Sequence, residues 1–377
     1  MTQRESDREL EKGMRLRVKI QGLGSLGEGL ARVDNSEIFI PKTAPGDEVD
    51  AEILEKKKGR YLAKLLKIES PGPTRIEAEC KHFEICGGCD FQHLPMSEQS
   101  AWKLRMAKHW IRRSPLAPFV KNLEMDQIHA PNPFGYRHRV RIQVKNGKPH
   151  FFKPHSHQTF ALEECPILVD GFFESICSQV ASLPDTKDVN ISALNSYEID
   201  GHQLKFSDAC FSQGNLQVNE LLWKRIEDDV IDLQQKKAAL DLFCGIGNFS
   251  VPLTDYFESV TGVESEGISL EYARKNSAEV EWIAGDCSET LEKLLREKRF
   301  FDFVLLDPPR MGALKTVESL KRMSPPAITY VSCNLESLIV DLTQLIKKGG
   351  YQIKRFTIAD LFPQTHHIES IVSLVPK

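Results

Sequence analysis

The chain has 377 residues, of which 41% are hydrophobic and 27% are charged, and its formal net charge is −4. This composition is ordinary for a globular protein, and the length predicts two or three domains. No apolar stretch approaches the roughly 18 residues of a membrane-spanning helix, and the densely charged residues 1–13 lack the apolar core of a signal peptide. We therefore expect a cytoplasmic protein with no membrane partner.

Residues 1–70 are predicted to form a small β-barrel, with strands beginning near residue 13. Residues 15–20 alternate polar and apolar side chains, as a strand with one buried face does. Further short strands are expected at 38–40, 49–54 and 61–68. Closely spaced short strands of this kind are typical of a small barrel. A rigid linker, Pro71-Gly72-Pro73, follows it.

Residues 74–215 are predicted to form a central α+β domain with a basic block. Residues 101–153 contain 12 lysines and arginines but only 2 acidic residues, a net charge of +10. A helix is expected over 98–113, and a strand over 136–144 places Arg137, Arg139 and Arg141 on one face. Because three arginines are costly to bury, that face should meet solvent or phosphate. The block indicates RNA as a partner, and a solvated charged surface is the alternative.

Nine cysteines, an odd number in a chain without a secretory signal, do not indicate a disulfide framework. Three of them have the spacing Cys-x5-Cys-x2-Cys, and a fourth lies farther along the chain. The set is Cys80, Cys86, Cys89 and Cys165. Four thiolates suit tetrahedral zinc or an iron–sulfur cluster, and the spacing alone leaves both open. Buried cysteines without a ligand are the third possibility.

Residues 216–377 show alternating helices and strands. Short apolar strands are expected at 238–243, 259–263, 280–283, 303–306 and 328–331, and 351–358 and 368–375 close the sheet. Helices are expected at 216–233, 267–276, 288–297 and 335–347. This alternation predicts a parallel sheet covered on both faces. Residues that follow the strands should therefore meet in one crevice, at the carboxyl edge of the sheet.

A glycine loop and two acidic residues follow three of these strands. Strand 238–243 leads into the loop Gly245–Phe249, and Glu264 follows the next strand, where a carboxylate can bind ribose hydroxyls. Asp286 follows the third strand and can reach an adenine amino group. The set looks like the S-adenosylmethionine site of class I methyltransferases. A dinucleotide site is disfavoured because the loop lacks a third glycine. The remaining alternative is a nucleotide-binding fold that no longer binds a cofactor.

Cys333 ends the strand at 328–331, and Asp307-Pro308-Pro309-Arg310 closes the strand before it. A thiol beside a methyl donor indicates covalent catalysis, because thiolate addition to pyrimidine C6 makes the weakly nucleophilic C5 enolate-like. A base must then remove the C5 proton, and Glu369, at the start of the last strand, is the candidate. The alternatives are a core cysteine and an exposed strand carboxylate.

Three motifs, Asp307–Arg310, Val331–Asn334 and Asp360–Glu369, resemble the RNA uracil-5-methyltransferase family. The resemblance covers nearly the whole chain and is closest to 23S rRNA members that carry an iron–sulfur cluster and an N-terminal TRAM domain. It implies an α/β fold: a Rossmann-like class I methyltransferase domain, an OB-like TRAM barrel and a central iron–sulfur and RNA-binding domain.

The resemblance also implies roles for individual residues. A 4Fe–4S cluster is expected on Cys80, Cys86, Cys89 and Cys165. Cys333 is expected to be the nucleophile and Glu369 the base. The S-adenosylmethionine contacts are expected at Gln213, Phe243, Asn248, Glu264, Asp286 and Asp307.

One family motif, Phe-x-Gln-Val-Asn, appears here with glycine in place of valine, as Phe211-Ser212-Gln213-Gly214-Asn215. A literal Gln217-Val218-Asn219 follows four residues later. We assign Gln213, because Phe211 and the following Glu220-Leu221 then fall in register with the family pattern.

The expected reaction is methylation of uridine C5 in RNA, with 23S rRNA as the expected substrate, by a monomer. The barrel and the basic block would hold the RNA backbone while the uridine is flipped out of its stack. Methylation of transfer RNA, methylation of cytosine C5 or an exocyclic amine, and a non-catalytic RNA-binding protein with a decayed cofactor site are the alternatives. Arg310 in place of Tyr or Phe after Asp-Pro-Pro disfavours amine chemistry.

Overall fold

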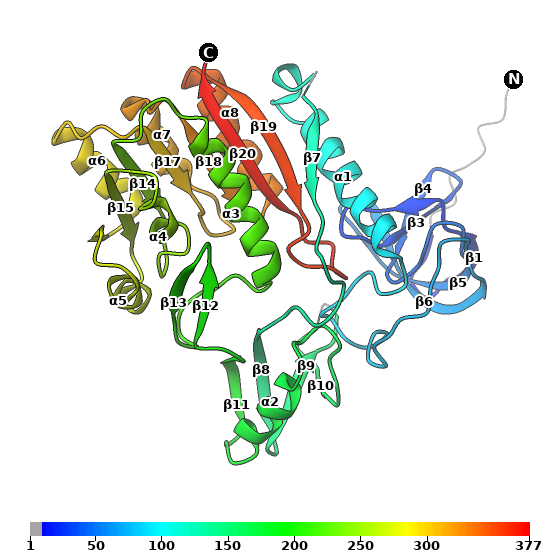
Figure 1. Cartoon of the computed structure of the whole chain (residues 1–377). Coiled ribbons are helices and arrows are strands. Elements are labelled where there is room, and N and C mark those ends of the chain that lie inside the picture. The colour runs from blue at the N-terminus through cyan, green and yellow to red at the C-terminus, as the bar shows by residue number, and fades with distance from the viewer. Residues whose placement is uncertain (1–9, 122, 155) are drawn as a thin grey trace, which may run out of the picture.

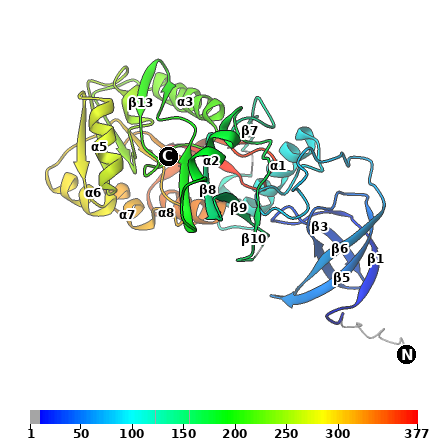
Figure 2. The same ribbon diagram turned by 90° about the horizontal axis from the view of Figure 1, so that it is seen from below.

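The computed structural model describes residues 10–121, 123–154 and 156–377. Residues 1–9 of the predicted N-terminal domain lie outside the described residues. Figures 1 and 2 show a small N-terminal barrel at one end of the molecule, a large α/β domain at the other, and a smaller sheet between and beside them. Within the described residues, no helix is long and apolar enough to cross a membrane.

The N-terminal barrel is a single six-stranded sheet in the order β1-β5-β6-β4-β3-β2. Its strands are β1 (Arg15–Lys19), β2 (Gly22–Leu23), β3 (Gly29–Val33), β4 (Ser36–Ile40), β5 (Glu48–Lys57) and β6 (Arg60–Ser70). The chain from β1 into β2 pairs first with β5 and then with β3, so it closes the sheet on itself. Buried aliphatic side chains fill the interior, among them Ile38, Val49 and Ile53.

The central segment contributes to two sheets. Its own sheet has the order β10-β9-β8-β11 and is covered by α2 (Phe172–Val180). The strands are β8 (Arg139–Lys145), β9 (Lys148–Phe152), β10 (Thr159–Ala161) and β11 (Thr186–Ser192). A hairpin of β12 (Ser196–Ile199) and β13 (His202–Lys205) then leads to the α/β domain. The 3-10 helix η1 (Ala117–Phe119) follows the first helix.

That first helix, α1 (Met96–Arg112), and strand β7 (Met125–Ile128) belong structurally to the α/β domain. Strand β7 pairs in parallel with β19 (Tyr351–Ala359) and forms an edge of the eight-stranded sheet. Ala107 and Ile111 of α1 lie in the same core cluster as residues of that sheet. The eight-stranded sheet therefore extends beyond residues 216–377. The sequence did not predict this extension, because a local pattern does not reveal which distant strand completes a sheet edge.

The large sheet has the order β16-β15-β14-β17-β18-β20-β19-β7, as expected for a class I methyltransferase fold. The remaining strands are β14 (Ala238–Leu242), β15 (Ser259–Glu264), β16 (Val280–Ala284), β17 (Phe303–Leu306), β18 (Ile328–Ser332) and β20 (Glu369–Pro376). Strands β14 to β18 are parallel, and β20 is antiparallel to both neighbours. Every strand predicted within residues 216–377 is present, with its ends within one or two residues.

Helices cover both faces of this sheet. They are α3 (Leu216–Ile231), α4 (Ser250–Leu253), α5 (Gly267–Asn276), α6 (Cys287–Arg296), α7 (Leu314–Met323) and α8 (Leu335–Lys348). One core cluster joins α1, α6, α7 and α8 to one face, and a second joins α3, α4 and the β12–β13 hairpin to the other. The sequence analysis missed α4 and α7. All four residues of α4 are buried, whereas α7 buries one face against the sheet.

Candidate active site

The loop after β14 is shaped to bring backbone close to a ligand. Phe243 has φ +65°, a left-handed conformation that is unfavourable for a non-glycine residue and that clusters at functional sites. Gly247 has φ +91°, and a Cβ there would approach the Trp282 ring to 2.7 Å, so only glycine fits. Beneath the loop, burial raises the pKa of Asp241 to about 8. Its Oδ1 has no hydrogen-bond partner in the described part of the chain.

Glu264 and Asp286 are held in place by backbone N–H groups. Glu264 Oε2 accepts from Gly245 N at 2.9 Å, and its Oε1 accepts from the next two backbone N–H groups at 2.7 Å each. Asp286 caps α6, and Oδ1 accepts from Ser288 N at 2.8 Å and Glu289 N at 3.1 Å. Hydrogen bonds from Ser288 and from these amides lower the Asp286 pKa. Both groups are therefore fixed carboxylates with acceptor sites remaining.

Asn248 is directed toward the protein by its hydrogen bonds. Its Oδ1 accepts from Tyr197 Oη at 2.7 Å and from Asn219 Nδ2 at 2.9 Å, while its Nδ2 donates to Asn219 Oδ1 at 3.0 Å. These bonds join the glycine loop to α3 and to the β12–β13 hairpin. Asn219 belongs to the second motif, Gln217-Val218-Asn219, which was not assigned to the site from the sequence.

Gln213 reaches the sheet edge. Its Nε2 donates to Asp307 Oδ2 at 3.3 Å, whereas Gln217, on the first turn of α3, accepts from Asn132 at 2.9 Å. Gly214 explains the departure from the family motif, because a Cβ there would come within 2.9 Å of the Phe362 ring. The geometry favours Gln213 as the glutamine that belongs to the site.

Cys333 and Glu369 are neighbours because of strand register. Strands β18 and β20 pair Ser332 with Ser370, so the next residues along each strand, Cys333 and Glu369, lie opposite each other. Glu369 is only 3% exposed, and Cys333 is half-buried. An exposed strand carboxylate is thereby excluded for Glu369.

The charges around this pair are coupled. Burial raises the pKa of Glu369 well above its usual range, and the nearby Asp307 carboxyl adds to the effect. Burial, with the charges of Glu369 and Asp307, raises the pKa of the Cys333 thiol to about 11. Burial also raises the pKa of Asp307 to about 7. Arg310 opposes the shifts of Cys333 and Glu369, which makes it the residue of this site whose role the sequence motif did not reveal.

The four predicted metal ligands come together around one cavity. Cys80, Cys86 and Cys89 are buried, Cys165 is partly exposed, and all four line a cavity of about 520 Å³. Burial raises the pKa of Cys89 and of Cys165 to about 12 each, and the charges of the other cysteines add to both shifts.

A buried cation lies beside this cavity. Among the described residues, no group of three or more His, Cys, Asp and Glu side chains is arranged to hold a metal ion. Lys42 of the barrel, 9% exposed, directs its ammonium at the carbonyls of Phe83 and Cys86, the latter at 3.1 Å. Burial lowers the pKa of Lys42, and negative charge on Cys86 and Cys89 opposes that shift. Ionised thiols at this place would therefore stabilise the buried ammonium.

Comparison with known proteins identifies relatives of this chain. Residues 194–377 match the family model described as tRNA (Uracil-5-)-methyltransferase, and residues 9–66 match the TRAM domain. The 23S rRNA (uracil(1939)-C(5))-methyltransferase RlmD of Shewanella sediminis is 30% identical over 94% of each chain, and that of Shewanella halifaxensis is 31% identical over 95% of each. The chain belongs to the RNA uracil-5-methyltransferase family. The predicted enzyme class, an S-adenosylmethionine-dependent RNA uracil-5-methyltransferase, is confirmed.

A solved structure shares the fold of this family member from end to end. The tRNA (uracil-54, C5)-methyltransferase of Pyrococcus abyssi, solved with S-adenosyl-L-homocysteine, superimposes with a TM-score of 0.74 at 22% identity. The match covers 95% of this chain and 99% of that one. The predicted combination of a class I methyltransferase domain and an N-terminal TRAM domain is confirmed.

The three arginines of the basic block do not share one environment, and the expectation that all three meet solvent or phosphate is wrong for Arg139. Its guanidinium donates to the carbonyls of Cys210 and Asp208, the latter at 2.9 Å. Arg137 Nε donates to Arg139 O at 2.9 Å, and exposed Arg141 pairs with Asp188 at 3.0 Å. Arg139 is covered because the 208–212 segment, distant in sequence, packs over this strand face.

Proposed function

We propose that this enzyme methylates C5 of a uridine in 23S rRNA through a covalent bond between Cys333 and uridine C6. The observation that carries the proposal is the register of β18 and β20, which brings a half-buried thiol opposite a buried carboxyl at the edge where the cofactor loop ends. S-adenosylmethionine, when bound, supplies an electrophilic methyl group and a positively charged sulfonium.

The residues of the site divide the proton and bond changes between them. The Cys333 sulfur forms a bond to C6, and the electrons of the C5–C6 double bond make C5 nucleophilic toward the methyl group. Glu369 then takes the proton from C5. The electrons of that C–H bond restore the double bond, and the Cys333 thiolate leaves. A thiol is required because C5 alone is too weak a nucleophile.

The charges around Cys333 and Glu369 indicate what ionises these two groups. With a pKa of about 11, the Cys333 thiol of the free enzyme keeps its proton at neutral pH. Positive charge entering the site lowers the pKa of the thiol and of both carboxyls, since opposite charge favours the ionised form. Arg310 already supplies part of that charge. A bound methyl donor would therefore favour the Cys333 thiolate and the ionised Glu369, with the released protons passing to solvent.

We assign the cofactor contacts to the residues around the glycine loop. Glu264 and Asp286 suit the ribose and the adenine, since each is a fixed carboxylate at a strand end. Gln213, Phe243 and Asp307 lie toward the reacting end, and Asp307 can meet the uracil edge or the cofactor. Asn248 acts by holding the loop against Asn219.

The identity of the RNA is supported by the named relatives. Those at 28–31% identity over nearly the full chain are 23S rRNA enzymes, whereas the solved transfer RNA enzyme is 22% identical. Mass spectrometry of digested ribosomal and transfer RNA from a deletion strain tests this. Loss of 5-methyluridine from 23S rRNA, restored by the wild-type gene and not by Cys333→Ala, is expected. Loss confined to transfer RNA would instead support the alternative substrate.

We propose further that the four-cysteine cavity holds a 4Fe–4S cluster, with Cys80, Cys86, Cys89 and Cys165 as ligands. The mutual proximity of the thiols and the buried Lys42 ammonium support a thiolate-bound, negatively charged group. No step of the proposed reaction passes through it. Anaerobically purified enzyme should contain iron and acid-labile sulfide. Stoichiometric zinc without sulfide would contradict the cluster.

RNA binding is assigned to the barrel and the central segment. The hairpin between β5 and β6 presents Lys57, Lys58 and Arg60 as exposed cations, and Arg141 is exposed on β8. Such cations displace counterions from phosphates, so affinity should fall with salt. We propose that the enzyme acts as a monomer with three domains. Residues 1–70 form the barrel, residues 216–377 with α1 and β7 form the catalytic domain, and the rest of 74–215 forms the central domain.

A further inference from the structure

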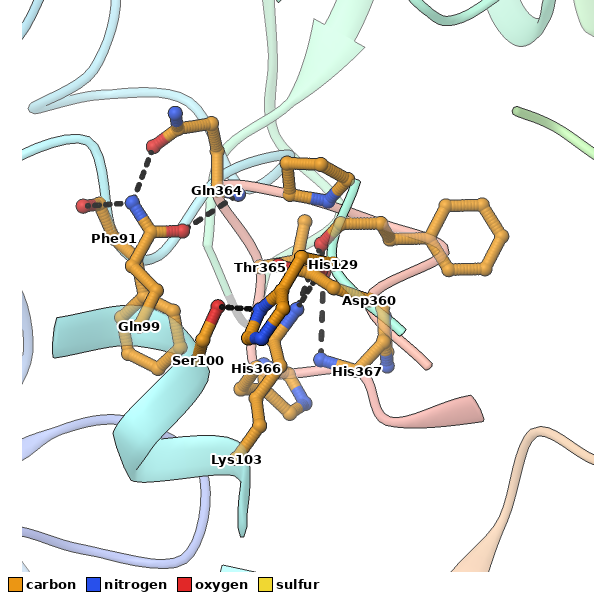
Figure 3. A network of polar contacts seen from close by, with 12 residues as sticks. Phe91, Gln99, Ser100, Lys103, His129, Asp360, Gln364, Thr365, His366 and His367 are labelled. Atoms are coloured by element: carbon orange, nitrogen blue, oxygen red, sulfur yellow. Dashed lines mark hydrogen bonds and ion pairs between the residues drawn. The ribbon is translucent and has the colours of Figure 1, made fainter. Parts of the chain in front are cut away.

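The loop between β19 and β20 carries Glu369 at its end and is held from outside the α/β sheet. Figure 3 shows its residues enclosed by side chains from α1 and from the segment that follows the cysteines. Gln364, in the middle of the loop, has φ +69°, a strained conformation for a residue with a side chain. Such a conformation persists only where surrounding contacts impose it.

Helix α1 supplies the first set of contacts. Lys103 Nζ lies 2.5 Å from Asp360 Oδ1, with the two side chains 1% and 3% exposed, and also donates to Phe362 O at 3.0 Å. Gln99 forms a two-way pair with Gln364: its Nε2 donates to Gln364 Oε1, and its Oε1 accepts from Gln364 N, both at 2.9 Å. These bonds fix the first half of the loop.

The residues directly after Cys89 supply the second set. Asp90 N and Phe91 N both donate to Gln364 O, at 2.8 and 3.0 Å. Asp90 Oδ2 accepts from His366 N at 3.0 Å and lies 2.7 Å from His366 Nδ1. His366 is adjacent to His367, whose Nδ1 lies 3.1 Å from Arg310 Nη2. A continuous chain of contacts thus runs from the cysteine segment to the groups that face Cys333 and Glu369.

The cysteine segment has little structure of its own to hold Asp90. Residues 80–92 contain turns and bends but no helix or strand. Two of the four thiols, Cys86 and Cys89, lie within four residues of Asp90. Phe91, directly after Asp90, is fully buried against Trp102 and holds the far end of the segment. A group bound by the thiols would restrain the other end, which leads into Asp90.

We propose that Asp90 is a positioning residue that couples occupancy of the four-cysteine cavity to the placement of Glu369. With the thiols bound, Asp90 holds the backbone of residues 364–366 in its strained form, and Glu369 enters β20 facing Cys333. With the thiols free, the segment before Asp90 relaxes, and the contacts of Asp90 with His366 weaken while those from α1 remain. The inference rests on the proposed binding of a group by the cysteines, and it holds for either a cluster or zinc.

The test compares Asp90→Ala and Asp90→Asn with the matched control Glu84→Gln, which alters an exposed carboxylate on the same segment. Hydrogen exchange is measured for peptides covering 360–369, together with iron, zinc, sulfide and S-adenosylmethionine binding. Asp90→Ala should keep its metal content and cofactor affinity. Exchange in 364–367 should rise about tenfold or more, since a hydrogen bond to a charged acceptor is lost. Asp90→Asn, which retains an acceptor oxygen for His366 N, should restore part of the protection.

Catalysis supplies a readout that general destabilisation does not reproduce. If Glu369 is misplaced, kcat should fall with the KM for S-adenosylmethionine unchanged, and the Cys333–RNA adduct should accumulate because elimination slows. Wild-type enzyme stripped of its bound group by chelation should show the same exchange and the same adduct, which serves as the test if Asp90→Ala does not fold.

Two results would overturn the coupling: exchange in 360–369 that is unchanged after the thiols are freed, or a wild-type enzyme in which the thiols bind nothing. Purified enzyme with zinc and no sulfide would contradict the cluster alone, and the exchange experiment on the zinc-stripped protein would still decide the coupling.

Discussion

The reactivity of Cys333 toward an alkylating reagent should be far lower in the folded enzyme than in the unfolded chain. At pH 8 a thiol with the ordinary pKa of 9.0 is about one-tenth thiolate, whereas one with a pKa of about 11 is about one-thousandth thiolate. Because the thiolate is the reacting form, iodoacetamide should modify Cys333 about a hundredfold more slowly in the native protein than in urea.

The direction of change in two variants tests the cause. The ionised form of Glu369 raises the Cys333 pKa, so Glu369→Gln should lower the apparent pKa of alkylation. Arg310 lowers the pKa, so Arg310→Met should slow alkylation further. Peptide mass spectrometry of Cys333 over pH 7–10 gives each apparent pKa. Native alkylation as fast as in urea, with no response to either variant, would refute the assigned electrostatics.

Three further outcomes are expected. Cys333→Ala should abolish methylation and form no adduct, while Glu369→Gln should accumulate a methyl-labelled protein–RNA adduct on denaturing gels. Normal turnover by Glu369→Gln would exclude Glu369 as the base. Arg139→Ala should loosen the 208–213 segment, so it should weaken S-adenosylmethionine binding in calorimetry and leave the salt dependence of RNA binding intact. Arg141→Ala should reduce the slope of that salt dependence by about one unit. The reverse pattern would place Arg139 on the RNA. Lys103→Met should destabilise the α/β domain by about 3–5 kcal/mol in denaturant unfolding, because Asp360 is left as an unpaired buried charge. The double variant Lys103→Met/Asp360→Leu should recover much of that loss. A cost under about 1 kcal/mol for the single variant would show that the pair is dispensable.

The parts of the site that follow strand ends were predictable from the sequence. Glu264, Asp286, Asp307 and Cys333 each come directly after an apolar run, and parallel strands bring such positions to one edge. The local period of hydrophobic side chains was sufficient to place these runs within one or two residues.

Other features depend on register and long-range packing, which a local pattern does not contain. The pairing of Cys333 with Glu369 results from the antiparallel register of β18 and β20. Arg139 is covered by a segment about 70 residues later in the chain, and Asp90 meets His366 across 276 residues. A family motif indicated that these residues belong to a site, and only the fold reveals which of them touch.

The placement of β7 and α1 has a consequence for how the catalytic domain can be made. Both elements lie within residues 74–215, before the strands of the central sheet, yet they complete the sheet edge next to β19 and supply the buried partner of Asp360. A fragment beginning at residue 194 or 216 would expose an unpaired strand edge and leave a carboxylate without its ammonium. During synthesis, α1 and β7 emerge early, whereas the strand and the carboxylate that they contact lie within the last fifty residues of the chain. The catalytic unit of this enzyme is therefore discontinuous in sequence, and a shortened version would need residues 96–128 supplied alongside it.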